Sequence, residues 1–361
     1  MRSWNLASIE EAFTAAAIDP GQWSAALELA ARQTESRGAL LLPIRGDRLP
    51  NSPASQGVAR ATESYFRDGW HLRDERFRGV AKMIKTGVID DFDCLPADLI
   101  KRNPFYQELL VPAGLCWFAG VRMGQGDDVW CLSIQRGIRQ APFTPDEKAK
   151  LSKLSLSLEG VVMLAKALGD AAATATLEAF EVSNTAVLLL NRQGEVIRAN
   201  RSAERLLCTE LRISAKRLRS MDSTVTAELD RSLQELVWSE QRASLMQPIA
   251  MPRSDDSPIL AYPLKLPGMS ASPLGDAQAA IVLVDPSVRR HAPLANLQSA
   301  FRLTTAEARL ACGLASGDSL EASCEALGIA KETGRNHLKS IFSKTGTHRQ
   351  SELVLMMARM L

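Results

Sequence analysis

The sequence predicts a multidomain protein with two mixed α+β units followed by an all-α unit of four helices. At 361 residues the chain is long enough for two to three domains, each able to bury its own core. In residues 1–168 and again in 177–285, helix-like patterns flank strand-like patterns that are joined by tight turns, which favours α+β folds with antiparallel sheets. Residues 295–361 show only helical periodicity. These three ranges are the domains that we expect.

The composition is that of a soluble globular protein, with 46% apolar residues, 23% charged residues and a formal net charge of +2. No apolar run reaches the ~18 residues that a transmembrane helix needs. The N-terminal residues, MRSWNLASIEEAF, include acidic residues where a signal peptide has its apolar core. We therefore expect a cytoplasmic protein that does not enter a membrane.

Motifs for catalysis and metal binding are absent from the sequence. Neither G-x-x-x-x-G-K-S/T nor G-x-S-x-G nor H-E-x-x-H occurs. The six cysteines include no C-x-x-C pair, which favours reduced thiols over structural zinc or disulfides; a redox-sensing thiol is the alternative. The four histidines, at 71, 291, 337 and 348, lack the spacing of metal ligands. We expect no metal, no cofactor and no enzymatic activity.

The first unit, residues 1–168, alternates helical and extended patterns. Strands are expected at residues 38–44, 87–89, 114–123 and 128–136, and helices at 7–16, 23–34, 58–70 and from Pro145 onward. The polar stretch 49–57 is expected to be a loop. Helices that flank an antiparallel sheet resemble the GAF and PAS folds of sensor domains.

Within this unit, the segment Tyr65–Arg76 (YFRDGWHLRDER) combines aromatic and charged residues. Aromatic walls with a few polar groups are typical of small-molecule pockets, so Tyr65, Trp70 and Asp74 are candidate ligand-binding residues. The alternative is that Tyr65 and Trp70 are core aromatics and that Asp74 caps a turn. The segment loosely resembles the pocket of LuxR-type signal-binding domains, where aromatic residues and an aspartate contact an acyl-homoserine lactone. Its order and spacing differ, and Glu75 follows Asp74 where that family has proline.

The second unit, residues 177–285, follows a run of small residues, 169–176, that suits a linker or a helical signalling segment. Its opening, VLLLNRQGEVIRANRSAERLL, resembles a PAS domain, including an Asn-x-x-Ala element at Asn200. Strands are expected at 185–190, 195–199, 260–266 and 277–285, and helices from Asn200 and at 224–238. No histidine lies between His71 and His291 to ligate haem, and Cys208 lies outside a flavin-adduct motif. We expect a cofactor-free module for dimerisation and relay.

The third unit begins with a capping-box pattern, Thr304 and Glu307, before an apolar-periodic run that ends at Gly317. Three further helices are expected at residues 319–327, 331–346 and 349–361. Gly328 supplies a tight turn between the first two of them. Short helices joined by a glycine-bearing turn to a basic helix make a helix-turn-helix.

The segment Lys331–Gly346 has two different faces when it is placed on a helix at about 100° per residue. The arc that faces a core contains Gly334, Leu338, Ile341, Phe342 and Thr345. The opposite arc contains donors suited to phosphates and base edges, namely Thr333, Arg335, Asn336, Lys339, Ser340, Ser343 and Lys344. A basic stripe on an isolated helix is usually only a solvated face, so the interpretation of this helix as DNA-binding depends on the helices that surround it. From Lys331 to Arg349 five basic residues accompany one acidic residue, which focuses positive charge here.

Residues 301–356 resemble the C-terminal DNA-binding domain of the LuxR family of bacterial transcription regulators. The matching positions are Leu303-Thr304-x-x-Glu307, Gly317, Leu327-Gly328-Ile329, Thr333, His337-Leu338, Ile341-Phe342, Lys344, Gly346 and Glu352-Leu353. Gly334 replaces the family's usual valine, and Ser323 and Cys324 replace an Ile-Ala pair. Because glycine inside a helix costs about 1 kcal/mol relative to alanine, we expect a less stable domain than in relatives.

The resemblance implies a transcription regulator that binds double-stranded DNA as a homodimer on a pseudo-palindromic site. Pairing is expected through the sensor modules and the apolar fourth helix around Met356, Met357 and Met360, and a small-molecule signal is expected at the sensor modules. The residues expected to contact DNA are Lys331, Thr333, Arg335, Asn336, Lys339 and Lys344, with Thr333 and Lys344 on phosphates. The alternative, which Gly334 and Ser323 favour, is a protein-binding regulator or anti-activator with a degenerate helix-turn-helix.

Overall fold

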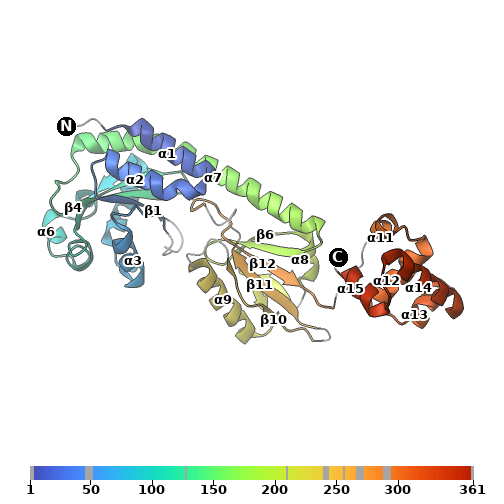
Figure 1. Cartoon of the computed structure of the whole chain (residues 1–361). Coiled ribbons are helices and arrows are strands. Elements are labelled where there is room, and N and C mark those ends of the chain that lie inside the picture. The colour runs from blue at the N-terminus through green and yellow to red at the C-terminus, as the bar shows by residue number, and fades with distance from the viewer. Residues whose placement is uncertain are drawn as a thin grey trace. The chain divides into compact units, whose positions relative to one another are not determined.

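The computed structural model of the chain describes residues 4–44, 52–126, 128–208, 210–238, 244–254, 257–265, 272–287 and 294–358. They form two compact units, Met1–Asp285 and Pro286–Leu361. The first unit combines helices with antiparallel sheets, whereas the described part of the second unit contains only helices (Figure 1). Mixed helix and sheet followed by a helical C-terminal region is the order expected from the sequence.

The first sheet has the strand order β1-β4-β3-β2, and all neighbouring strands are antiparallel. Its strands are β1 (Gly38–Pro43), β2 (Val88–Asp90), β3 (Leu115–Met123) and β4 (Trp130–Gly137). Successive side chains of a strand point to opposite faces, so Ala39 and Leu41 enter one core while Leu40 and Leu42 enter another. Because both faces are covered, β1 is a continuous apolar run rather than an alternating one.

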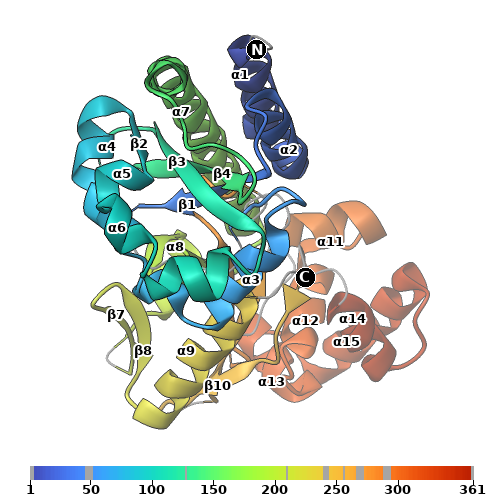
Figure 2. The same cartoon turned by 90° about the vertical axis from the view of Figure 1, so that its left-hand side faces the viewer.

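Helices cover both faces of this sheet (Figure 2). One layer consists of α1 (Leu6–Ile18), α2 (Trp23–Gln33) and the first half of α7 (Pro145–Val182). The opposite layer consists of α3 (Ala59–Arg67), η2 (Trp70–Leu72), η3 (Glu75–Gly79), α4 (Val80–Thr86), α5 (Asp91–Cys94), α6 (Ala97–Ile100) and η4 (Phe105–Leu110). The strands and the longer helices match the expected ranges closely. Of the loop expected at 49–57, residues 49–51 lie outside the described residues.

Helix α7 is longer than the sequence predicts and includes residues 169–176, so that segment is helical. It starts with the expected capping box, in which Thr144 and Glu147 exchange hydrogen bonds. Among the described residues this 38-residue helix is the one that is long and apolar enough to cross a membrane, although the core helix of a soluble protein can be equally long and apolar. The sequence predicts no segment long and apolar enough to span a membrane, and α7 is an exception to that prediction.

Packing buries part of the apolar surface of α7, although Leu156, Met163 and Val182 stay exposed. Its first half buries Leu151, Leu154, Leu158, Val161 and Val162 against the first sheet and α1. Its last turns bury Ala173 and Leu177 against the second sheet. The expected boundary between residues 168 and 177 therefore falls inside one helix, and the finer domain limits stay a prediction.

The second sheet has the order β10-β11-β12-β5-β6, and the short strand β9 also pairs with β11. Its strands are β5 (Ala186–Leu190), β6 (Val196–Ala199), β9 (Ser244–Leu245), β10 (Ile249–Met251), β11 (Ile259–Lys265) and β12 (Ala279–Val284). Leu188 and Leu190 pack with Leu229 and Leu233 of α9 (Ser223–Trp238), whereas Val187 and Leu189 face α7. The four expected strands are present, although residue 266 of the expected strand 260–266 lies outside the described residues.

Two features complete this region. Helix α8 (Arg201–Leu206) begins at Asn200, as expected, because the Asn200 Oδ1 accepts from the backbone of Ala203 at 2.9 Å. A hairpin of β7 (Leu211–Ser214) and β8 (Arg217–Ser220) follows and is not among the expected strands, although its alternating apolar and polar residues are typical of a half-buried hairpin.

The second unit contains α11 (Leu294–Phe301), α12 (Thr305–Ala315), α13 (Leu320–Leu327), α14 (Lys331–Thr345) and α15 (Gln350–Ala358). Its core consists of Leu297, Leu303, Ala308, Leu310, Ala311, Leu314, Ile341, Leu353 and Met357. Placing Met357 on a pairing surface is therefore wrong, because its side chain completes this core at 2% exposure. Leu355 is the apolar residue of α15 that is 57% exposed, and Met360 lies outside the described residues.

Candidate functional site

The turns of the helix-turn-helix are set by local capping, as expected. The Thr304 Oγ1 accepts from the backbone of Glu307 at 3.3 Å, and the Glu307 Oε2 accepts from the backbone of Thr304 at 2.7 Å. Ser319 caps α13 by accepting from the backbone of Ala322 at 3.1 Å. Gly328 (φ 67°) ends α13 in the left-handed region, which glycine adopts without steric cost. These caps fix the angle at which α14 follows α13.

One face of α14 is packed and the other is exposed, as the residue pattern predicts, except that Ser340 and Lys344 of the arc expected to face DNA contact the buried Glu307 of α12. Gly334 and Ile341 are buried, and Leu338 and Phe342 are partly buried against the same core. A Cβ placed on Gly334 would lie 2.1 Å from the Sγ of Cys324 on α13. The two helices therefore approach closely because position 334 has no side chain.

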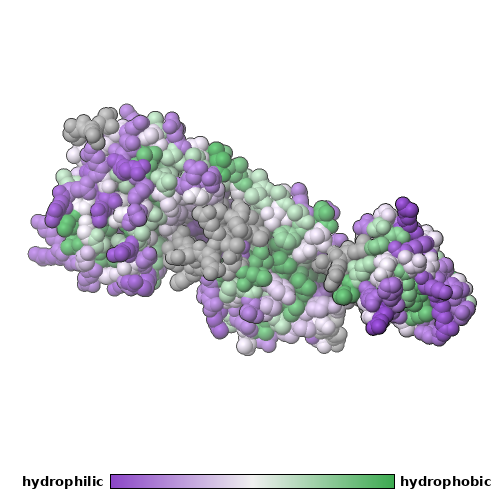
Figure 3. All heavy atoms as spheres, viewed as in Figure 1, coloured by the Kyte–Doolittle hydropathy of each residue, from purple (hydrophilic) through white to green (hydrophobic). Residues whose placement is uncertain are grey.

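The exposed face of α14 presents Lys331, Thr333, Arg335, Asn336 and Lys339. Lys331 pairs with Glu321, and Arg335 Nη1 lies 3.2 Å from Glu332 Oε2; all four of these side chains are at least half exposed. Exposed ion pairs contribute little to stability, so both cations can exchange partners at small cost. Thr333, Asn336 and Lys339 make no side-chain hydrogen bond with the residues that the structure describes. Hydrophilic side chains dominate the visible face of this unit (Figure 3).

Lys344 differs from the other cations of α14 because its partner is buried. Its Nζ donates to the Glu307 Oε2 at 2.6 Å, and the Ser340 hydroxyl donates to Oε1 of the same carboxylate at 2.6 Å. The Glu307 side chain is only 5% exposed. Although burial opposes ionisation, these donors and the cap at Thr304 lower the pKa of Glu307 to about 2. Lys344 and Ser340 therefore anchor α14 to the start of α12.

In the first unit, the candidate ligand residues Tyr65, Trp70 and Asp74 are all buried, and two of them meet. The Tyr65 hydroxyl donates to the Asp74 Oδ2 at 3.0 Å. Asp74 also caps η3 by accepting from the backbone of Arg76 at 3.0 Å, which is the turn-capping role considered as the alternative. Trp70 packs edge-on against Phe105, with ring centroids 6.3 Å apart. Trp70 is thus a core aromatic, whereas Tyr65 and Asp74 belong to a polar cluster.

Arg76 is the centre of that cluster. Its Nε and Nη2 donate to the two Asp74 oxygens at 2.9 and 2.8 Å, and its guanidinium lies 4.4 and 4.6 Å from the ring centroids of Phe105 and Phe118. Burial alone would lower the pKa of Arg76, but Asp74 more than offsets this, so the pKa is raised and the group stays charged. Sequence reasoning did not identify Arg76, although it is the charged residue two positions after Asp74.

Two cavities adjoin Arg76, each with about 340 Å³ of space that protein atoms do not fill, part of it open to solvent. The first, which we call the Gln135 cavity, is lined by Tyr65, Phe105 and Gln135 among others; the second, the Asp74 cavity, is lined by Asp74 and Phe118 among others. Arg76, Leu42 and Ser133 line both, and Trp70 lines neither. The alternation Cys131, Ser133, Gln135 along β4 is the sequence signal that could have placed polar groups on this face.

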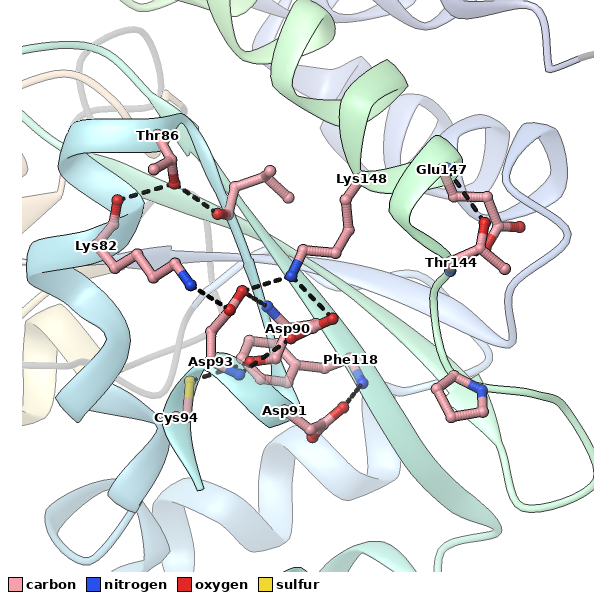
Figure 4. Close-up of polar contacts among 12 residues, drawn as sticks. Lys82, Thr86, Asp90, Asp91, Asp93, Cys94, Phe118, Thr144, Glu147 and Lys148 are labelled. Atoms are coloured by element: carbon pink, nitrogen blue, oxygen red, sulfur yellow. Dashed lines mark hydrogen bonds and ion pairs between the residues drawn. The ribbon is translucent and has the colours of Figure 1, made fainter. Parts of the chain in front are cut away.

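The carboxyl groups of α5 and of Asp90, which caps it, contact β3, η4 and helix α7; Figure 4 shows the contacts with Phe118 and Lys148. Asp91 accepts from the Tyr106 hydroxyl at 2.6 Å and from the backbone of Phe118 at 2.7 Å, and its burial raises the pKa to about 6. Figure 4 shows its neighbours Asp90 and Asp93 directed toward Lys148 of α7, whose Nζ lies 3.0 and 2.6 Å from their carboxylates. The short helix α5 therefore connects the cavity region with the beginning of α7.

Comparison with solved structures gives weak likeness over about half of the chain. No curated protein matches. Among solved structures, the phage VqmA–DPO complex is 19% identical, with a TM-score of 0.25, and the match covers 52% of this chain and 87% of that chain. A Vibrio cholerae VqmA dimer, described among LuxR-type receptors in the absence of target DNA, is 15% identical (TM-score 0.21; 49% and 85% covered). VqmA bound to DPO is 16% identical (TM-score 0.21; 49% and 84% covered).

A family model matches one stretch of the chain. Residues 176–243 match the PAS domain, and this range begins at the end of α7 and includes β5, β6, α8 and α9. The PAS resemblance of the sequence around Asn200 is confirmed for these residues. Strands β5 and β6 of the second sheet therefore lie within the PAS match, whereas β9, β10, β11 and β12 of the same sheet lie beyond it.

Proposed function

We propose that this chain is a DNA-binding transcription regulator of LuxR type, whose helix-turn-helix is controlled by a ligand or partner at the sensor modules. The observation that carries the proposal is the exposed face of α14, where Thr333, Asn336 and Lys339 make no side-chain hydrogen bond with described residues of their own chain. Short donors and flexible cations on a packed, capped helix suit the edges of base pairs and the phosphates beside them. We place this regulator in the cytoplasm and assign it no catalytic step.

The six proposed DNA-contacting residues differ in their exposure and in the acidic partners that their side chains have in this structure. Lys339 and Asn336 are exposed at the middle of α14, and we assign them to direct contact with DNA. Lys331 and Arg335 are held only by exposed acidic partners, which phosphates can replace. Lys344 is held by buried Glu307, so a phosphate contact of Lys344 competes with the anchoring of α14. We keep Thr333 and Lys344 as phosphate-positioning residues of secondary weight.

A single helix of this kind makes few phosphate contacts, so we propose a homodimer on a two-fold-related site. The exposed Leu355 of α15 supports pairing through the C-terminal helix. We assign residues 1–168 to a GAF-like sensor and 177–285 to the PAS module, and propose that both add to the dimer. The PAS module serves as a relay in this scheme.

The test is the salt dependence of duplex binding by the full chain, measured by fluorescence anisotropy. Each lost phosphate contact reduces the slope of log affinity against log salt by about 1. We expect Lys339→Ala and Arg335→Ala to weaken binding and flatten this slope. Lys153→Ala, which removes an exposed lysine of α7, is the matched control and should change neither quantity.

Equal affinity and slope for Lys339→Ala and the unsubstituted chain would contradict the assignment of α14. The alternative function is a protein-binding regulator or anti-activator with a degenerate helix-turn-helix. A fragment of residues 286–361, which form a compact unit, can distinguish the transcription regulator from this alternative. Salt-dependent duplex binding by this fragment supports the regulator, and a folded fragment that does not bind duplex DNA supports the alternative.

A further inference from the structure

Two residues that line the Gln135 cavity each carry a buried polar atom without a hydrogen-bond partner among the described residues, namely Nη1 of Arg76 and Oε1 of Gln135. The two residues are 7% and 3% exposed. Six buried side-chain atoms of the described chain lack a partner, and these are the two whose residues line a described cavity. Buried polar groups are normally hydrogen-bonded, so a missing partner at a cavity wall indicates a place for a ligand group.

The other polar groups of this region are already engaged. The Asp74 Oδ2 accepts from Tyr65 at 3.0 Å and from Arg76 Nη2 at 2.8 Å, and its Oδ1 accepts from Arg76 Nε at 2.9 Å. The Gln135 Nε2 donates to the Ser133 hydroxyl at 2.8 Å. Asp74 is therefore closed to a ligand, and polar recognition falls to the second guanidinium nitrogen of Arg76 and to the amide of Gln135.

The charges of the region favour an uncharged ligand. Asp74 already neutralises Arg76 through two hydrogen bonds, and Asp91 places a second carboxyl near the same guanidinium. A carboxylate ligand would add negative charge to a buried site in which the one described cation is balanced, and burying unbalanced charge is costly. A neutral carbonyl oxygen can accept from Nη1 without that cost.

The remaining walls favour a small and mainly apolar molecule. Tyr65, Phe105, Leu109 and Leu110 line the Gln135 cavity, and the last three belong to η4. Segment η4 is a π-helical turn, a less regular backbone that occurs frequently at functional sites. The volume of about 340 Å³ includes open solvent and the enclosed part is far smaller, so the lining side chains must move to admit a molecule larger than water.

We propose that the Gln135 cavity binds a small, uncharged carbonyl compound whose oxygen accepts from Arg76 Nη1 and whose adjacent amide or hydroxyl pairs with Gln135. The side-chain amide of Gln135 can turn to accept or to donate, so either group satisfies it. The rest of the molecule lies against Phe105 and the leucines of η4. This inference rests on the ligand-controlled part of the proposed function and names the class of ligand.

Three probes of similar shape test this chemistry on the full chain without DNA. Benzamide offers a carbonyl and an amide, benzoate offers a charged carboxylate, and toluene offers only the ring. Saturation-transfer NMR with competition gives their relative affinities. We expect benzamide to bind about tenfold or more tightly than benzoate or toluene. Benzoate binding as tightly as benzamide, or no saturation transfer to benzamide at about 10 mM, would overturn the proposal.

Two variants identify the groups that select benzamide. Gln135→Leu keeps the size of the side chain, and we expect it to lower benzamide affinity about tenfold while leaving toluene binding unchanged. The pair Asp74→Asn with Arg76→Met removes the guanidinium without leaving Asp74 as an unpaired buried charge. It should abolish the preference for benzamide over toluene. Arg67→Ala, at an exposed arginine of α3, is the control and should keep the preference.

Circular dichroism checks that each variant is folded, and a folded variant pair that still selects benzamide contradicts the role of Arg76. The benzamide test and the DNA-binding test can fail independently of each other. Selective benzamide binding by a chain that fails to bind duplex DNA leaves this inference standing and removes the regulator. Salt-dependent DNA binding by a chain that does not select benzamide removes this inference alone.

Discussion

The Sγ of Cys324 occupies the space that a side chain at position 334 would fill, since a Cβ on Gly334 would lie 2.1 Å from it. Cys324 of α13 therefore supplies the volume that Gly334 of α14 lacks, and the two helices stay packed. The glycine that the sequence marks as a weakness is required by the cysteine opposite.

A double-mutant cycle tests this relationship in residues 286–361. Gly334→Ala gains about 1 kcal/mol of helix propensity, but the clash with Cys324 should give a net loss of about 1–3 kcal/mol. Cys324→Ala removes Sγ and leaves the two Cβ atoms 3.8 Å apart, an ordinary contact. The double variant should therefore be more stable than Gly334→Ala alone, with a coupling energy of at least about 1 kcal/mol in urea denaturation. Additive effects would show that the residues do not compete for space.

Ser323→Ala should stabilise the same unit by about 1 kcal/mol. The Ser323 Oγ is buried and has no partner among the described residues, so the hydroxyl loses water without gaining a hydrogen bond. Ser319→Ala in the same helix is the matched control, and it should destabilise by about 1 kcal/mol because Ser319 caps α13. Thermal and urea midpoints measure both changes. Destabilisation by Ser323→Ala would mean that the hydroxyl is satisfied.

The pKa of Glu307 predicts how the C-terminal unit responds to acid. Folding lowers this pKa from 4.5 to about 2, so the stabilisation is complete above pH 4.5 and is lost as pH falls toward 2. The loss should amount to about 2–3 kcal/mol of unfolding free energy. Glu307→Gln should remove this part of the acid dependence while lowering stability at neutral pH. Equal acid sensitivity in the variant would place the responsible carboxylate elsewhere.

Asn200→Ala should destabilise the PAS region more than the loss of an ordinary helix cap. Besides capping α8, the Asn200 side chain accepts from the backbone of Val187 at 3.0 Å and donates to the Thr185 carbonyl at 2.7 Å. Loss of a cap costs about 1 kcal/mol, and two further buried hydrogen bonds raise the expected total to about 2–4 kcal/mol. Denaturation followed in residues 1–285 measures the change. A loss no larger than that of Ser319→Ala would show that the two backbone contacts contribute little.

Local signals account for what the sequence predicts well. Thr144 with Glu147, and Thr304 with Glu307, mark helix starts because a capping box involves residues only three apart. Gly328 marks a helix end for the same reason, since its left-handed conformation is a property of one residue. The alternating faces of α14 likewise follow from the helical period alone.

Contacts between distant residues account for what the sequence does not predict. Glu307 and Lys344 are 37 residues apart, and no local pattern marks Lys344 as an anchor of α14. Asp91 and Phe118 meet across 27 residues. The turns between Trp70 and Leu110 are too short for a helical period and are held by single carboxylates such as Asp74. The cavities depend on how these turns meet the sheet.

Helix α7 is continuous over 38 residues, and at about 1.5 Å per residue its axis is about 57 Å long. Its first half packs on the first sheet and α1, and Leu177 near its other end lies under the second sheet, so α7 joins the two sheets rigidly. A tilt of about 2° of a rigid helix of this length displaces one end relative to the other by about 2 Å. Ala171→Pro would break the helix at an exposed position between its two packed parts, and paired spin labels at its ends would then move independently.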